Sequence, residues 1–221
     1  MTYVMSDVHG QLEKFETMLA QINFNKTDRL YVLGDVIDRG EHGVEILTRI
    51  ASTPNMTLLL GNHELMCLQA MRRNERVRDV WLDGANGGRP TLKALLDLSQ
   101  DRVDFLLNII ESAPETLDVE AGGRKFRLVH GGPGDTQYER LWCRPSPLKS
   151  YRRMGHTLIV GHTPTCNFWP NPWRYLSRVE HMEIFYCEGF IGIDCGCACI
   201  GTVPGGCLGC LRLDDMTEFY A

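Results

Sequence analysis

The chain has 221 residues, which is enough for one domain with a sizeable core. Its hydrophobic content of 43% and charged content of 23% are those of an ordinary globular protein. The formal net charge of -5 argues against a nucleic-acid partner, because nucleic-acid-binding proteins usually carry a basic surplus. Phosphate chemistry stays open, since bound metal ions can supply positive charge.

The first ten residues contain no basic stretch followed by an apolar run, so they do not resemble a signal peptide. No apolar run is long enough to span a membrane. We therefore expect a cytoplasmic protein without a membrane partner. In that reducing compartment the nine cysteines are expected to be thiols rather than disulfides.

Short apolar runs that end abruptly in Gly, Asp, Asn or His recur along the chain and predict buried strands. These runs are residues 3–5, 30–33, 58–60, 126–129 and 158–160. Apolar residues at helical spacing predict helices within residues 12–22, 44–50, 65–73 and 91–110. Strands that alternate with helices predict an α/β sheet, in which ligand sites gather beyond the carboxyl ends of the strands.

The C-terminal part has few helical signals and three further predicted strands, at residues 190–194, 207–213 and 216–220. Gly205 and Gly206 form a plausible turn between two of them. A β-rich half is therefore expected to pack on the α/β half. No linker, repeat or low-complexity tract interrupts the chain, so residues 1–221 are expected to form a single domain.

Polar side chains with the chemistry of metal ligands follow five of the predicted strands. Asp7 and His9 are two positions apart, which places them on the same side of an extended chain. Further candidates at strand ends are Asp35, Asn62, His130 and His162. Carboxylate, imidazole and amide oxygen together suit divalent manganese, iron or zinc. Six ligands suffice for two ions if one carboxylate bridges them.

Three of these segments resemble the signature motifs of the metal-dependent PPP-type phosphatases. They are residues 6–10 (SDVHG), 34–40 (GDVIDRG) and 61–64 (GNHE). His130-Gly131 and Gly161-His162 resemble the two later histidine motifs, in the same order. Ser6 stands where the family has glycine. The resemblance covers residues 6–162 and is stronger to the short bacterial and phage lambda enzymes than to the longer eukaryotic ones.

The resemblance implies a calcineurin-like metallophosphoesterase fold, with a central β-sandwich flanked by helices and a two-metal site at the C-terminal ends of strands. It assigns Asp7 and His9 to the first ion and makes Asp35 the bridge. The ligands implied for the second ion are Asn62, His130 and His162. Two divalent cations are expected as cofactors, with manganese preferred and iron or zinc as alternatives.

The same resemblance implies four catalytic residues. Arg39 and Arg144 would hold the phosphoryl oxygens of the substrate, together with Asn62. His63 would protonate the leaving alkoxide, and Asp38 would orient His63. Such an acid is needed because a serine alkoxide is a poor leaving group.

The resulting hypothesis is a serine/threonine protein phosphatase that hydrolyses phosphomonoesters in phosphoproteins by direct attack of a metal-bridging hydroxide. The alternative is a hydrolase of dinucleoside polyphosphates such as diadenosine tetraphosphate, which shares the fold and metals. Those hydrolases usually lack an acid at the position of Asp38 and carry Asp at that of Glu64, so both residues favour the phosphatase. A second alternative is a non-catalytic phosphate-binding module, which would be expected to lose a ligand or His63.

Two other features remain open at this point. Residues 207–210 (CLGC) have zinc-knuckle spacing, and three more cysteines alternate over residues 195–199 in an expected strand. We favour a structural core over a third metal site, since metal knuckles usually pair two such spacings. Trp81, residues 86–88 (NGG) and Thr91 form either a functional loop near the substrate groove, as in the family, or an ordinary helix connection.

Overall fold

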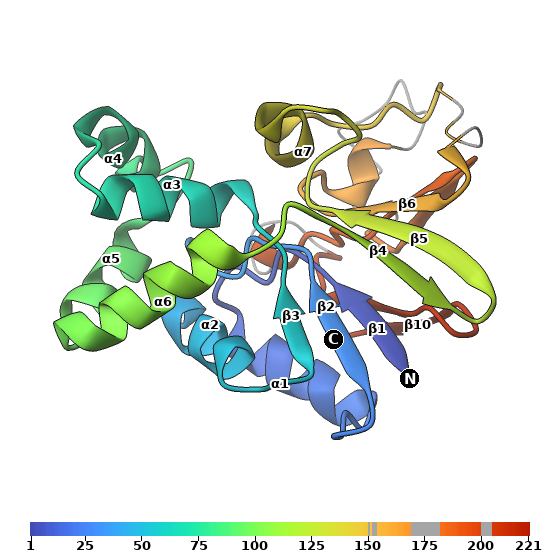
Figure 1. Ribbon diagram of the computed structural model, residues 1–221, viewed down its shortest axis with the longest axis horizontal. Coiled ribbons are helices and arrows are strands. Elements are labelled where there is room, and N and C mark those ends of the chain that lie inside the picture. The colour runs from blue at the N-terminus through green and yellow to red at the C-terminus, as the bar shows by residue number, and fades with distance from the viewer. Residues whose placement is uncertain (150, 152–153, 169–181, 200–204) are drawn as a thin grey trace.

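The computed structural model describes residues 1–149, 151, 154–168, 182–199 and 205–221. Two five-stranded sheets pack face to face, and helices flank them (Figure 1). This arrangement confirms the predicted sandwich flanked by helices. Among the described residues, no helix is long and apolar enough to cross a membrane.

The first sheet has the strand order β10-β9-β1-β2-β3. Its strands are β1 (Thr2–Met5), β2 (Arg29–Val32), β3 (Met56–Leu58), β9 (Gly209–Arg212) and β10 (Thr217–Tyr220). Strands β1, β2 and β3 run parallel, whereas β9 is antiparallel to both β1 and β10. The carboxyl ends of the three parallel strands therefore meet at one edge of this sheet.

The second sheet has the order β4-β5-β6-β8-β7. Its strands are β4 (Thr116–Ala121), β5 (Arg124–Val129), β6 (Thr157–Val160), β7 (Phe185–Cys187) and β8 (Phe190–Gly192). Here β5, β6 and β8 are parallel, and the edge strands β4 and β7 pair antiparallel to their neighbours. Each sheet thus has a parallel centre whose strand ends can carry a site.

Seven α-helices lie in the described part of the chain. They are α1 (Leu12–Gln21), α2 (Gly43–Ala51), α3 (Asn62–Met71), α4 (Glu75–Leu82), α5 (Arg89–Leu96), α6 (Gln100–Ser112) and α7 (Gln137–Trp142). Helices α1 and α2 lie along the first sheet, α3 to α6 form a group beyond β3, and α7 lies on the side of the second sheet (Figure 1).

Alternate side chains of β1 pack into two different hydrophobic cores. Val4 points into the core between the two sheets, where it joins Leu33 and Phe126. Tyr3 and Met5 point the other way, into the core that the helices cover. Period-two alternation of this kind is what a strand buried on both faces requires. A third cluster, around Phe168, Phe185 and Phe190, covers the outer face of the second sheet.

Most of the predicted elements are confirmed, and one is wrong. Cys195, Cys197 and Cys199 do not alternate along a strand, because β8 ends at Gly192 and residues 197–199 form a short 3-10 helix, η4 (Cys197–Cys199). Cys195 and Cys197 are buried all the same. Helices α4 and α7 and strands β4 and β7 were not predicted.

Candidate active site

Loops that leave the carboxyl ends of β1, β2, β3, β6 and β8 surround one cavity of about 430 Å³. The predicted site residues that line it are Asp7, His9, Asp35, Arg39, Asn62, His63, Arg144 and His162. The other two, Asp38 and His130, are fully buried behind that lining. Segments far apart in the sequence are thus brought together where the two sheets meet.

The backbone around the cavity is strained. Six of the nine non-glycine residues with positive φ in the described part of the chain belong to the predicted site: Asp7, His9, Asp35, Asp38, Arg39 and His162. Left-handed backbone at a non-glycine residue costs about 1–3 kcal/mol and persists only where the surrounding structure imposes it. The strain is concentrated where side chains must be turned toward one point.

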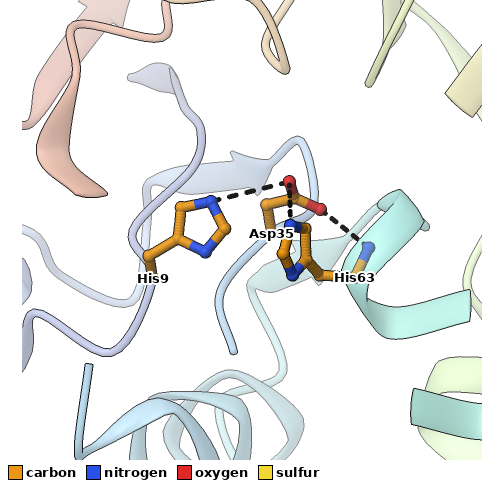
Figure 2. Close-up of side chains that lie close together, drawn as sticks. All are labelled: His9, Asp35 and His63. Atoms are coloured by element: carbon orange, nitrogen blue, oxygen red, sulfur yellow. Dashed lines mark hydrogen bonds and ion pairs between the residues drawn. The ribbon is translucent and has the colours of Figure 1, made fainter. Parts of the chain in front are cut away.

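Asp35 lies at the centre of the arrangement (Figure 2). Its Oδ2 is 3.6 Å from Nε2 of His9 and 3.8 Å from Nε2 of His63, and its Oδ1 is 3.3 Å from Nε2 of His130. Two groups of possible ligand atoms share it, and within each group these atoms lie within 4.8 Å of one another. One group is His9, Asp35 and His63; the other is Asp35, His130 and His162. A carboxylate shared in this way has the placement that a bridging ligand needs.

Backbone carbonyls orient two of the histidines. Nδ1 of His9 lies 2.9 Å from the carbonyl oxygen of Ile37, and Nδ1 of His130 lies 2.6 Å from that of Leu33. Because a carbonyl can only accept, Nδ1 carries the proton in both rings. Nε2 then faces the site, as a metal-binding imidazole requires.

The two remaining predicted ligands lie beside these histidines. The Oδ1 atom of Asn62 is 2.8 Å from Nε2 of His130. Oδ2 of Asp7 accepts hydrogen bonds from the Ser6 hydroxyl and from the backbone N–H of His162, the latter at 2.9 Å. Ser6, where the family has glycine, therefore contacts a predicted ligand directly.

Buried negative charge dominates the site. Burial, opposed by His130 and reinforced by the charge of Asp35, raises the pKa of Asp7 to about 6. Burial and then Asp35 raise the pKa of Glu64 to about 7, and burial with Asp7 raises that of Asp194 well above its usual range. Carboxylates are crowded in this way where cations normally offset their repulsion. The mixed oxygen and nitrogen donors therefore fit divalent ions of intermediate hardness.

The histidines respond to the same charges. Burial lowers the pKa of His130, but Asp35 and Asp7 outweigh burial and raise it to about 10. Burial, followed by the charge of His130, lowers the pKa of His162 to about 3. His162 is therefore a neutral imidazole at physiological pH, which is the form that binds a metal ion.

His63 and Asp38 form a buried pair, with Nδ1 of the histidine 2.7 Å from Oδ2 of the aspartate. Burial lowers the pKa of His63, but the charges of Asp35 and Asp38 outweigh burial and raise it above its ordinary value. Nε2 of His63 faces Asp35 (Figure 2), and His63 lines the cavity. A protonated imidazole held in this position can act as a general acid.

The two predicted phosphate-binding arginines reach the cavity from different sides. Nη1 of Arg39 is 3.0 Å from Nε2 of His9, and its Nη2 is 3.3 Å from Nε2 of His63. Its backbone N–H donates to the carbonyl of Gly87 at 2.8 Å. Arg144 is exposed, follows α7 and lines the cavity beside His162. Together they offer donors to two sides of a bound phosphoryl group.

Glu64 has a role that the motif comparison did not predict. Its carboxylate accepts the backbone N–H of Asp35 at 2.7 Å and that of Val36 at 2.9 Å. Gly61 allows this approach, because a Cβ there would lie 2.4 Å from both Oδ1 of Asp35 and Oε2 of Glu64. Glu64 thus holds the loop that carries Asp35.

Asp194 also lines the cavity but was not among the predicted site residues, although its position in the sequence could have indicated it. It follows the apolar residues of β8 just as the other site residues follow their strands.

The cysteines do not form a third group of possible metal ligands. Among the described residues, no set of three or more possible ligands contains a cysteine. Cys195, Cys197 and Cys210 are buried, as residues of a structural core are expected to be.

The comparisons with known proteins match this geometry. The family model for calcineurin-like phosphoesterases matches residues 2–166. Serine/threonine-protein phosphatase 2 of Salmonella typhimurium is 31% identical over 176 residues, which cover 72% of this chain and 78% of that protein. The chain therefore belongs to the calcineurin-like phosphoesterase family. It is a metallophosphoesterase, and the family implies a dinuclear site for divalent metal ions.

Other relatives carry a different name. A symmetrical bis(5'-nucleosyl)-tetraphosphatase of Acidovorax ebreus is 36% identical over 132 residues, but these cover 59% of this chain and 43% of that enzyme. The chain thus spans less than half of that relative. The solved structure of a protein serine/threonine phosphatase from Saccharomyces cerevisiae covers the whole chain and 78% of its own, with a TM-score of 0.63 and 15% identity. It supports the fold alone.

Proposed function

We propose that this metallophosphoesterase is a serine/threonine protein phosphatase, which hydrolyses phosphomonoesters of serine and threonine side chains. The observation that carries the proposal is the buried pair of His63 and Asp38, whose histidine turns Nε2 toward the shared carboxylate of Asp35. An alkoxide leaving group requires a general acid at this place.

The proposed metal ligands divide between two ions around Asp35. Asp7, His9 and Asp35 would hold one ion; Asp35, Asn62, His130 and His162 would hold the other. When bound, such ions lower the pKa of water and add positive charge at the phosphoryl group. The Nδ1 atoms of His9 and His130 are held by backbone carbonyls, so both rings are oriented before any ion binds.

The remaining steps belong to side chains. Arg39 and Arg144 bind the phosphoryl oxygens through guanidinium forks, which match the planar spread of those oxygens. Their contacts strengthen as charge develops on the transferring group. His63 gives its Nε2 proton to the departing serine or threonine oxygen, and Asp38 stabilises the imidazolium before the transfer.

The second candidate is a dinucleoside tetraphosphatase, which is favoured by the relatives with that name. Its leaving group would be a nucleotide phosphate, which departs as a stable anion and needs little protonation. A buried acid would then contribute little to turnover. The presence of the His63–Asp38 pair therefore supports the protein phosphatase over this candidate.

The decisive experiment assays the manganese-reconstituted protein on a phosphoserine peptide, a small aryl phosphate and diadenosine tetraphosphate side by side. We expect the highest kcat/KM on the phosphopeptide among the biological substrates. Preferred cleavage of the tetraphosphate would overturn the proposal. A His63→Asn variant serves as the matched control, because it should lose phosphopeptide turnover while its metal content is unchanged.

A further inference from the structure

The side chain of Asp38 has two further hydrogen-bond partners besides His63. Besides Nδ1 of His63, Nε1 of Trp81 lies 2.8 Å from Oδ2, and the hydroxyl of Thr91 lies 2.6 Å from Oδ1. The backbone N–H of Asp38 also donates to that hydroxyl, at 2.9 Å. The Asp38 side chain is fully buried, so these protein groups surround a carboxylate that water does not reach.

The directions of these hydrogen bonds fix where the protons are. An indole N–H can only donate, so Oδ2 of Asp38 must accept. The Thr91 hydroxyl accepts from the backbone N–H of Asp38 and donates its own proton to Oδ1. Both oxygens of Asp38 therefore act as acceptors. Nδ1 of His63 must then be the donor in that pair, which leaves Nε2 as the atom that exchanges a proton with the substrate.

The segment that carries Trp81 and Thr91 is closely fitted to this task. Trp81 is the buried residue of α4. Its indole ring packs so closely on Gly88 that a Cβ there would lie 2.5 Å from the ring. Gly87 accepts the backbone N–H of Arg39. One segment therefore holds the carboxylate behind His63 and the backbone of the adjacent arginine.

We propose that Trp81 and Thr91 are positioning residues for phosphoester hydrolysis. They fix the plane of the Asp38 carboxylate and thereby aim Nε2 of His63 at the leaving oxygen. A carboxylate with a single partner can turn about its broad terminal torsion, whereas donors on both oxygens leave it one orientation. The inference rests on the proposed function, in which His63 is the general acid.

A purely structural role would affect all substrates equally, so the test compares leaving groups. Trp81→Phe keeps an aromatic side chain but removes the N–H. Thr91→Val keeps the shape of the side chain but removes the hydroxyl. Each loses a hydrogen bond to a charged group, and we expect kcat on the phosphoserine peptide to fall roughly tenfold or more. On p-nitrophenyl phosphate, whose leaving group needs little protonation, kcat should change by less than about threefold.

A conservative variant and a double variant provide two further tests. Thr91→Ser keeps the hydroxyl and should keep most phosphopeptide turnover, and Thr48→Val on α2 is the matched control for loss of a threonine hydroxyl. In a His63→Asn background, Trp81→Phe should cause no further loss, because residues that act through one group are not additive. Equal losses on both esters, or a full additional loss in that background, would overturn the inference.

A second readout needs no turnover. In the zinc-loaded protein, which is diamagnetic, the Nδ1 proton of His63 should give a protected downfield NMR resonance. Trp81→Phe and Thr91→Val should speed its exchange with water, whereas Thr48→Val should not. An unchanged resonance in both variants would overturn the positioning role. Absence of phosphomonoester turnover in the wild type would instead overturn only the proposed function.

Discussion

Asp35 follows a strand of the first sheet and His130 follows a strand of the second, yet Oδ1 of Asp35 lies 3.3 Å from Nε2 of His130. The candidate active site is therefore also a joint between the two sheets. A change in charge at this contact between the sheets is therefore expected to change both the activity and the stability of the fold.

Removal of metal ions should affect both properties together. We expect chelation to abolish turnover and manganese to restore it best, because the proposed ligands mix carboxylate, amide and imidazole groups. Ions that bind only the folded state should also raise the Tm with concentration. Parallel activity and thermal-unfolding titrations check this. Full turnover in thoroughly metal-free protein would contradict the two-metal proposal, and Asp35→Asn should remove the manganese response.

The charge of His130 predicts a pH dependence of the metal-free protein. Its pKa is raised from an ordinary 6.5 to about 10 in the folded state, against the lowering effect of burial and through Asp35. A raised histidine pKa stabilises the fold fully below the unfolded value, and this stabilisation is lost as pH rises toward the folded value. The metal-free protein should therefore be less stable at pH 9 than at pH 7, as urea unfolding can measure.

Metal binding should also depend on the protonation of His130, but the affinity for the metal ion should rise with pH, whereas the stability of the metal-free protein falls. The ion needs a neutral imidazole, so it must displace the proton of His130, and the apparent affinity for manganese should rise with pH up to about 10. Calorimetry in two buffers of different ionisation enthalpy would detect the released proton. His130→Gln should reduce both the release and the pH-dependent loss of stability, and an undiminished proton release would show that another group is responsible.

The role of His63 predicts a dependence on the leaving group. We expect His63→Asn to lower kcat on alkyl phosphates by roughly 10²–10⁴-fold, the usual contribution of a general acid. The loss should be smaller on aryl phosphates, whose leaving groups depart with less protonation. Initial rates over a series of substituted phenyl phosphates measure this, and a loss that is uniform across the series would remove His63 from the role of acid.

The position of the site could be predicted from the sequence because parallel strands bring their carboxyl ends to one edge. Asp7, Asp35 and His162 each follow such a strand, so local patterns were enough to place them. Asp194 obeys the same rule and could have been included. In contrast, the contact of Glu64 with the backbone of Asp35 depends on tertiary packing, and no local pattern indicates it.

The missed elements have identifiable causes. Helix α4 has Val77, Val80 and Trp81 at helical spacing, but it spans only eight residues, which is too short for a clear period, and it buries only Trp81. Helix α7 is short, although Thr136 and Glu139 form a capping box that marks its start. The cysteines at 195–199 alternate as strand residues do, but the chain turns into a 3-10 helix after Gly196, whose φ is 75°. Alternation over so few residues does not distinguish these conformations.

The last prediction concerns the two arginines. Arg39 already lies against His9 and His63, whereas Arg144 approaches from the loop after α7. Arg39→Ala and Arg144→Ala should each lower kcat/KM for a phosphopeptide by roughly 10–100-fold, in line with hydrogen bonds to a charged group. Both variants should stay folded and keep their metal content.

Substitution by lysine distinguishes geometry from charge. Arg39→Lys and Arg144→Lys should recover only part of the loss, because an ammonium group is a point charge and cannot bind two oxygens in one plane. Arg76→Ala, at an exposed position on α4, is the matched control and should leave kcat/KM unchanged. Turnover and metal content should be measured on the same preparations. If Arg144→Ala behaves like the control, phosphate binding depends on Arg39 alone, and the side of the cavity near α7 serves another part of the substrate.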